Sequence, residues 1–123
     1  MRVLKGRVVT GAGNFSFWIE KLQDHYRNKT GMQLFPGTLN IELEAPFDLP
    51  RERIRLDAEE YGGTVSVNIL HCKVFGRAAV ILRTDKADSE PQSRKIIEVA
   101  CELKLREQYQ IRDGDVIEVE VAD

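Results

Sequence analysis

Two oxygen-bearing side chains stand two residues apart in the segment Pro36-Gly37-Thr38-Leu39-Asn40. Because side chains alternate along a strand, Thr38 and Asn40 are expected to point to the same side. A threonine hydroxyl and an asparagine amide are oxygen donors that suit Mg²⁺ when substrate phosphates supply the negative charge. The plainer alternative is that Thr38 opens a strand and Asn40 faces solvent. Spacing alone does not decide between a metal site and this alternative.

A glycine-containing turn, Gly11-Ala12-Gly13, lies between a β-like segment and a helical one. Glycines allow backbone N–H groups to approach phosphate oxygens, and the start of a helix adds partial positive charge. The turn lacks the Lys-Ser/Thr pair of a P-loop and the third glycine of a dinucleotide-binding fingerprint. An ordinary tight turn is therefore the alternative to a phosphate-binding loop.

Two further polar groups occur near the C-terminal end. Glu98 stands among Ile96, Ile97, Val99 and Ala100, where an apolar environment would raise its pKa and let it accept a hydroxyl proton. Lys104 and Arg106 are cations suited to phosphate binding. The alternatives are the polar face of an amphipathic element for Glu98 and a solvated charged helix for the cations.

Short alternating segments predict most of the elements that must position these residues. Strands are expected at 2–9, 38–44 and 116–121, and several short antiparallel strands at 53–84 with turns at 61–64 and 75–77. One amphipathic helix is predicted with Ser16 as its N-cap, Phe15, Ile19, Leu22 and Tyr26 on its apolar face, and Gly31 as its stop. Residues 84–95 read as a long loop, 96–101 as a strand or helix, and 103–109 as a helical turn or two. This pattern predicts a single mainly β domain over residues 1–123, a small barrel with one amphipathic helix and short helical insertions.

Composition narrows the function classes. The 123 residues include 18 basic and 20 acidic side chains, for a net charge of −2, so no strong basic face is expected for nucleic acid. No apolar run approaches the roughly 20 residues that span a bilayer, and the first residues lack the apolar centre of a secretory signal. We therefore expect a cytoplasmic protein without a membrane partner. Cys72 and Cys101 stand far apart and are expected to be buried, reduced thiols.

The motifs occur in an order that resembles the CTP-dependent riboflavin kinases of archaeal type, as a divergent member. The Gly-x-Gly turn is followed by Pro36 to Asn40, by Ile96-Ile97-Glu98, by Lys104 to Gln108, and by a Gly-Asp turn into the last strand. The resemblance implies a six-stranded cradle-loop barrel that transfers the γ-phosphate of CTP to the 5′-hydroxyl of riboflavin, giving FMN and CDP.

The resemblance also implies residue roles. Thr38 and Asn40 would bind Mg²⁺, and Glu98 would lie at the flavin as the catalytic acid–base group. The expected nucleotide contacts are Gly11, Ala12, Gly13, Asn14, Phe15, Ser16, Leu103, Lys104, Leu105 and Arg106. Where the family has a further glycine, this chain has Asn14-Phe15-Ser16. The family's flavin-contacting threonine has no equivalent at matching spacing, so Thr84 is assigned to that role, with Ser93 as the alternative.

Two other functions remain open at the level of sequence. The first is a non-catalytic barrel that binds a flavin or nucleotide. The second is a DNA-binding swapped-hairpin barrel, suggested by Leu105-Arg106-Glu107 followed by the turn at 111–115. The acidic composition and the Pro36 to Asn40 segment favour small-molecule substrates over DNA.

Overall fold

The computed structural model describes residues 1–11 and 14–122. Within these residues, seven strands form one antiparallel sheet. The strands are β1 (Arg2–Val9), β2 (Leu39–Leu43), β3 (Ile54–Leu56), β4 (Val67–Val74), β5 (Arg77–Thr84), β6 (Ile96–Ala100) and β7 (Val116–Val121). The predicted strands at 2–9, 38–44 and 116–121 are confirmed, and the open choice at 96–101 resolves to a strand.

The sheet closes into a six-stranded barrel. Its order is β3-β4-β5-β6-β2-β1-β7, and β7 also pairs with β4, so every strand except β3 belongs to the closed ring. Closure removes the two exposed sheet edges that an open sheet would present. The prediction of a small six-stranded barrel is therefore confirmed.

Alternating side chains fill the barrel. In β2, Leu39, Ile41 and Leu43 are buried, while Glu42 between them is exposed, as expected for a strand with one face toward the core. Cys72 and Cys101 are free and buried, as the sequence predicts. Burial raises the pKa of Cys72 to about 12, which keeps this thiol protonated and unreactive near neutral pH.

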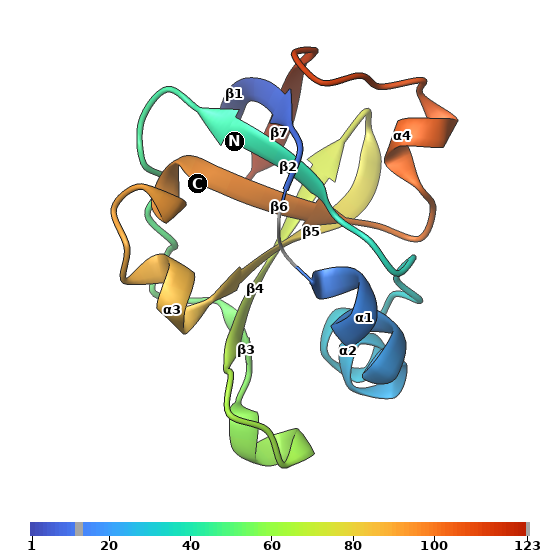
Figure 1. Ribbon diagram of the computed structural model, residues 1–123, viewed down its shortest axis with the longest axis vertical. Helices are drawn as coiled ribbons and strands as arrows, with labels where there is room; N and C mark the ends of the chain where they lie inside the picture. The colour runs from blue at the N-terminus through green and yellow to red at the C-terminus, as the bar shows by residue number, and fades with distance from the viewer. Residues whose placement is uncertain (12–13, 123) are drawn as a thin grey trace.

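The predicted amphipathic helix is present but divided. It forms α1 (Phe15–Lys21) and α2 (Gln23–Thr30), which meet at Leu22, where φ is −109° and ψ is 32°. The single-helix prediction was wrong because Leu22 leaves helical geometry while its side chain stays buried. The N-cap is Asn14 rather than Ser16, whereas Gly31 ends α2 in the left-handed conformation, as predicted. Figure 1 shows both helices packed against one end of the barrel.

Strand β3, the 3-10 helix η1 (Ala58–Tyr61) that follows it and the first part of β4 extend from the barrel (Figure 1), and we call this part the arm. The hairpin predicted at 61–64 is present, because this segment lies between the antiparallel strands β3 and β4, but its connection is longer than a tight turn: it includes η1, which ends at Gly62. A capping box between Asp57 and Glu60 starts this helix. The turn at 75–77 is confirmed between β4 and β5, with positive φ at Phe75 and Gly76.

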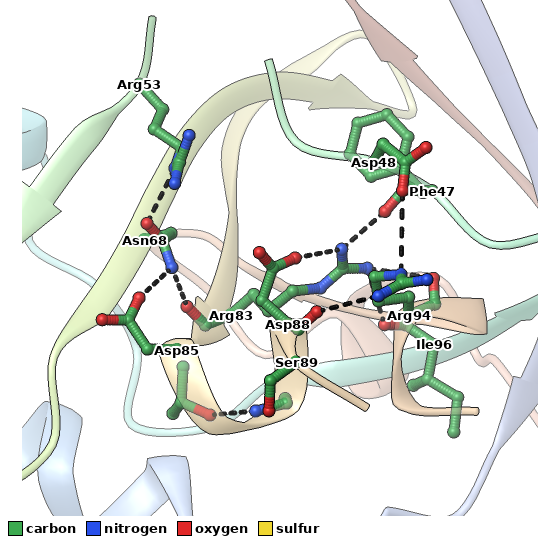
Figure 2. A network of polar contacts seen from close by, with 12 residues as sticks. Phe47, Asp48, Arg53, Asn68, Arg83, Asp85, Asp88, Ser89, Arg94 and Ile96 are labelled. Carbon is green, nitrogen blue, oxygen red and sulfur yellow. Dashed lines mark hydrogen bonds and ion pairs between the residues drawn. The ribbon is translucent and has the colours of Figure 1, made fainter. Parts of the chain in front are cut away.

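Residues 84–95 contain two short helices, so the prediction of an extended loop was wrong. They are α3 (Asp85–Asp88) and the 3-10 helix η2 (Ser93–Lys95). Figure 2 shows that the Arg83 guanidinium organises this segment from within the core. Arg83 is 3% exposed and donates to the backbone oxygens of Phe47, Arg94 and Ile96 at 2.5, 3.1 and 3.3 Å. Buried backbone oxygens need such donors, and no sequence pattern indicates that an arginine supplies them.

The last helix, α4 (Leu105–Gln108), lies between β6 and β7 and anchors itself through buried Leu105. It confirms the helical turn predicted at 103–109. None of the helices in the described part of the chain is both long and apolar enough to span a membrane.

Candidate functional site at the junction of two cavities

Three polar side chains gather on one side of the β2–β6 pair. The strand register places Asn40 opposite Glu98, and directly opposed residues of antiparallel strands project from the same face. Thr38 immediately precedes β2 and donates a hydrogen bond from Oγ1 to Glu98 Oε1 at 2.8 Å. The structure thus brings together the two predicted metal ligands and the predicted catalytic acid.

The Glu98 carboxyl group lies in an environment that favours its neutral form. Burial raises the pKa of Glu98, and the hydrogen bond from Thr38 opposes that shift in part. A carboxylate of this kind is a stronger base than a solvent-exposed one, so it can accept a proton from an alcohol that lies beside it.

Gly11, the first residue of the glycine-containing turn, lies against the Asn40 side chain. A Cβ atom placed on Gly11 would lie 2.2 Å from Asn40 Nδ2 and 2.6 Å from Asn40 Oδ1. Gly11 is therefore required for contact with the Asn40 amide. The amide has no hydrogen-bond partner among the described residues, which leaves its oxygen available to a ligand.

A metal ion at this position would depend on neutral oxygens. Within the described residues, no three His, Cys, Asp or Glu side chains lie close enough together to hold a metal ion. Thr38 and Asn40 provide oxygen donors on one side of the strand, the donor chemistry that Mg²⁺ accepts together with water and phosphate.

A first cavity of about 210 Å³ opens on one side of Thr38. Its walls come from the segment before β2 and from the chain after β6. They are Phe35, Pro36, Gly37, Thr38, Leu39, Val99, Cys101, Leu103, Lys104, Leu105 and Arg106. All four predicted nucleotide contacts from Leu103 to Arg106 therefore line a cavity that also contains Thr38.

Arg106 is fixed at the edge of this first cavity. Its Nη2 donates to Asp113 Oδ1 at 2.6 Å, and Thr10 Oγ1 donates to Asp113 Oδ2 at 2.5 Å. These two hydrogen bonds lower the pKa of Asp113 and keep it ionised. The Asp113-Gly114-Asp115 turn thus connects α4 to the residue that precedes the glycine turn, a link that sequence reasoning missed.

A second cavity, of about 450 Å³, lies between the helices and the arm. We call it the aromatic cavity, because three of its lining residues are Trp18, Tyr26 and Tyr61. The other lining residues are Asn14, Phe15, Leu22, Val65, Val67, Thr84, Lys86 and Glu98. Both residues predicted at the flavin, Thr84 and Glu98, therefore line the same cavity.

The remaining predicted contacts are distributed unevenly. Asn14 and Phe15, predicted at the nucleotide, line the aromatic cavity instead of the first cavity. Ser16 is exposed and lines neither of the two cavities, and Ala12 and Gly13 lie outside the described residues. The Thr84 hydroxyl accepts a hydrogen bond from the Ala87 N–H at 3.1 Å as the N-cap of α3. Ser93, the alternative to Thr84, lies in η2 and lines neither cavity.

Sequence reasoning missed the aromatic lining. Trp18 and Tyr61 come from α1 and the arm, with ring centroids 6.2 Å apart. Tyr26 was assigned to the apolar face of the helix, a pattern that cannot distinguish a core side chain from one that borders a cavity. The only available signal was the concentration of aromatic residues at 15–26.

The fold and the site define a small β-barrel in which Thr38, at the first cavity, hydrogen bonds to the half-buried Glu98, at the aromatic cavity. Residues 8–121 match the family model of the CTP-dependent riboflavin kinases, described as domain of unknown function DUF120. The chain belongs to this family.

Individual relatives agree with the family match. The chain is 34% identical over 128 residues to a riboflavin kinase of Methanocella arvoryzae, covering 95% of this chain and 56% of the relative. It is 31% identical over 133 residues to a riboflavin kinase of Pyrobaculum aerophilum, covering 96% and 60%. A riboflavin kinase of Methanococcus vannielii is 26% identical over 129 residues, which cover 93% of each chain. The chain thus spans little more than half of the length of the first two relatives.

Proposed function

We propose that this protein is a CTP-dependent riboflavin kinase, which transfers the γ-phosphate of CTP to the 5′-hydroxyl of riboflavin and releases FMN and CDP. The observation that carries the proposal is the 2.8 Å hydrogen bond between Thr38 and Glu98. Thr38 lines the first cavity and Glu98 lines the aromatic cavity. A phosphate donor in one and an alcohol acceptor in the other would therefore meet at this pair.

The aromatic cavity suits the acceptor. Its volume of about 450 Å³ falls in the range of small-molecule sites, which are mostly apolar with a few polar groups that orient the ligand. Trp18 and Tyr61 offer ring surfaces for a planar aromatic ligand. With the flavin ring among these side chains, the ribityl hydroxyl would extend toward Glu98.

Glu98 then acts on the nucleophile. As the 5′-oxygen forms a bond to the γ-phosphorus, its proton passes to the Glu98 carboxylate. The bond between the γ-phosphorus and the β–γ bridging oxygen breaks, and CDP leaves with the electron pair. Phosphoryl transfer depends mainly on in-line positioning and charge stabilisation, and a general base typically adds about 100- to 10,000-fold.

Thr38 and Asn40 are the residues that would hold Mg²⁺. When bound, the ion would neutralise charge on the phosphates. The Thr38 hydroxyl directs its proton to Glu98, so its lone pairs remain available. The Asn40 amide is held against Gly11, which limits its positions. Both observations fit a pair of fixed, neutral oxygen ligands.

The first cavity and its edge suit the nucleotide. Lys104 has a half-exposed side chain whose Nζ lies 3.4 Å from Glu107, a weak surface pair that a phosphate can displace. Arg106 is held by Asp113 and presents its guanidinium to the cavity from a fixed position. The choice of CTP over other triphosphates follows from the family, and the backbone of Leu103 to Arg106 is where a base edge would be recognised.

The test is FMN formation from riboflavin and Mg²⁺ with CTP, UTP, ATP and GTP supplied in turn. We expect turnover with CTP, and a strongly reduced but still measurable rate in Asn40→Ala without loss of fold. Riboflavin or CTP that raises the melting temperature without any product would indicate the non-catalytic binding barrel instead. A folded protein that produces no FMN with any of the four triphosphates would contradict the proposal.

A further inference from the structure

Tyr26 is a buried phenol whose hydroxyl makes no hydrogen bond to any of the residues that the structure describes. The residue is 1% exposed and lines the aromatic cavity. Its backbone groups bond within the helix and to Thr30. Two polar residues, Tyr61 and Glu98, lie close enough to act on the Tyr26 hydroxyl electrostatically.

This arrangement calls for an explanation, because buried tyrosine hydroxyls usually have a partner. The Tyr26 oxygen does not belong to the fully buried polar atoms that lack a partner, so the hydroxyl reaches the open space of the cavity, where a ligand can bond to it. The nearby polar groups already have partners. Tyr61 donates to the Val65 carbonyl oxygen, and Glu98 accepts from Thr38.

The hydroxyl keeps its proton under all working conditions. Burial, together with the neighbouring Tyr61 and Glu98, raises the pKa of Tyr26 well above its usual value. Tyr26 therefore offers one donor and its acceptor lone pairs to whatever occupies the cavity.

The walls beside Tyr26 restrict the kind of ligand. Trp18 and Tyr61 present rings from two sides, tilted by 55° to each other, and buried Phe15 adds a third aromatic surface. A flat heteroaromatic ring with polar atoms on its edge matches aromatic walls combined with one hydrogen-bonding group.

We propose that the Tyr26 hydroxyl is a specificity-determining contact that hydrogen bonds to the polar edge of the acceptor's flavin ring. This inference rests on the proposed function, because it takes the flavin to occupy the aromatic cavity. Tyr26 positions the ring, and Glu98 at the same cavity receives the hydroxyl at the far end of the ribityl chain. A ring of similar size without a polar edge would leave the hydroxyl unpaired and bind more weakly.

The test compares riboflavin with lumichrome, which has the ring but lacks the ribityl chain. Trp18 is the only tryptophan of the chain, so quenching of its fluorescence reports a flavin in the aromatic cavity, and calorimetry gives both affinities. We expect Tyr26→Phe to weaken both ligands by about 5- to 10-fold, the effect of one neutral hydrogen bond. In turnover, its KM for riboflavin should rise while its KM for CTP stays unchanged.

The matched control is Tyr109→Phe. The Tyr109 hydroxyl accepts from Arg77 Nε at 3.2 Å and its ring stacks on Phe75, and it lines neither cavity. This variant should bind both ligands as the wild type does. Tyr26→Phe should melt at the wild-type temperature or above it, because no protein hydrogen bond is lost.

Four results would count against the inference, and they have different meanings. If Tyr26→Phe binds both ligands normally, the inference fails and the proposed function stands. If only riboflavin is weakened, the hydroxyl contacts the ribityl chain and not the ring. If Tyr26→Phe melts well below the wild type, the hydroxyl stabilises the folded protein instead of binding the ligand. If the wild type binds neither ligand, the proposed function fails and the inference fails with it.

Discussion

Replacing Gly11 with alanine would alter the site without removing any atom that is assigned a chemical role. The added Cβ would lie 2.2 Å from Asn40 Nδ2 and 2.4 Å from Asn40 Cγ, whereas ordinary contacts begin at 3.4 Å. The Asn40 amide must therefore move by about 1 Å. Because the clash is with the end of a side chain and not with backbone, the protein can relieve it at little cost in stability.

The expected result is a selective loss of activity. A displacement of about 1 Å in a positioning group costs roughly 100-fold in rate. The melting temperature should change little, since a surface-accessible side chain absorbs the movement. FMN formation with CTP and a thermal melt on the same preparation measure both quantities.

A double-variant cycle then tests the reason for the loss. If Gly11→Ala acts only by displacing the Asn40 amide, it should cause no further loss in the Asn40→Ala background. Full activity in Gly11→Ala would refute the argument that Gly11 is needed to leave room for the Asn40 amide. An equal factor of loss in the wild-type and Asn40→Ala backgrounds would also refute it.

Three other perturbations separate stability from chemistry. Gly6→Ala places a Cβ 2.4 Å from the backbone oxygen of Glu42, so it should lower the free energy of unfolding by about 3 kcal/mol in chemical denaturation; a wild-type midpoint would contradict the β1–β2 packing. Arg83→Met leaves three backbone oxygens without their donor and should cost about 3–5 kcal/mol; a neutral result would show that the segment at 84–95 does not depend on Arg83. Glu98→Gln should lower turnover by about 100- to 10,000-fold. Burial raises the folded-state pKa of Glu98 above its ordinary value of 4.5. As pH rises from 4.5 through the folded pKa, the stability of the wild type should therefore fall relative to that of Glu98→Gln. The activity of the wild type should rise over the same interval, because the carboxylate is the active form. If the free energies of unfolding of the wild type and of Glu98→Gln changed with pH in the same way, this expectation would be contradicted.

The positions of the strands could be predicted from the local alternation of apolar and polar residues. The alternation at 38–44 and 116–121 fixes which side chains face the core, and a register error by one residue would expose Ile41 and Ile117. This is why the barrel and the shared orientation of Thr38 and Asn40 could be predicted from the sequence.

The predictions that were wrong concern features that depend on contacts between residues far apart in the sequence. The helix divides at Leu22, which stays buried but leaves helical geometry, and the sequence contains no glycine or proline there that would have indicated a break. The segment at 84–95 is ordered by Arg83, which lies in the preceding strand and reaches Phe47, far away in the sequence. No periodicity reveals a buried arginine that bonds to distant carbonyl oxygens.

In the candidate site, too, some features could be predicted from the sequence and others depend on tertiary contacts. The pairing of Thr38 with Glu98 depends on the β2–β6 register, which sequence spacing does not contain, although the order of the motifs indicated it through the family. The aromatic cavity depends on how α1 and α2 meet the arm. Tyr61 lies near Trp18 where α2 contacts the arm, and one of these contacts is the ion pair between Lys29 of α2 and Glu60 at 2.8 Å.

The most direct test of the two-cavity arrangement is a crystal structure of the protein with riboflavin, CDP and Mg²⁺ bound together. The account predicts the flavin ring beside Trp18 and Tyr26, the diphosphate beside Thr38 and Lys104, and the 5′-hydroxyl within hydrogen-bond distance of Glu98. A flavin bound outside the aromatic cavity, or a 5′-hydroxyl directed away from Glu98, would contradict it.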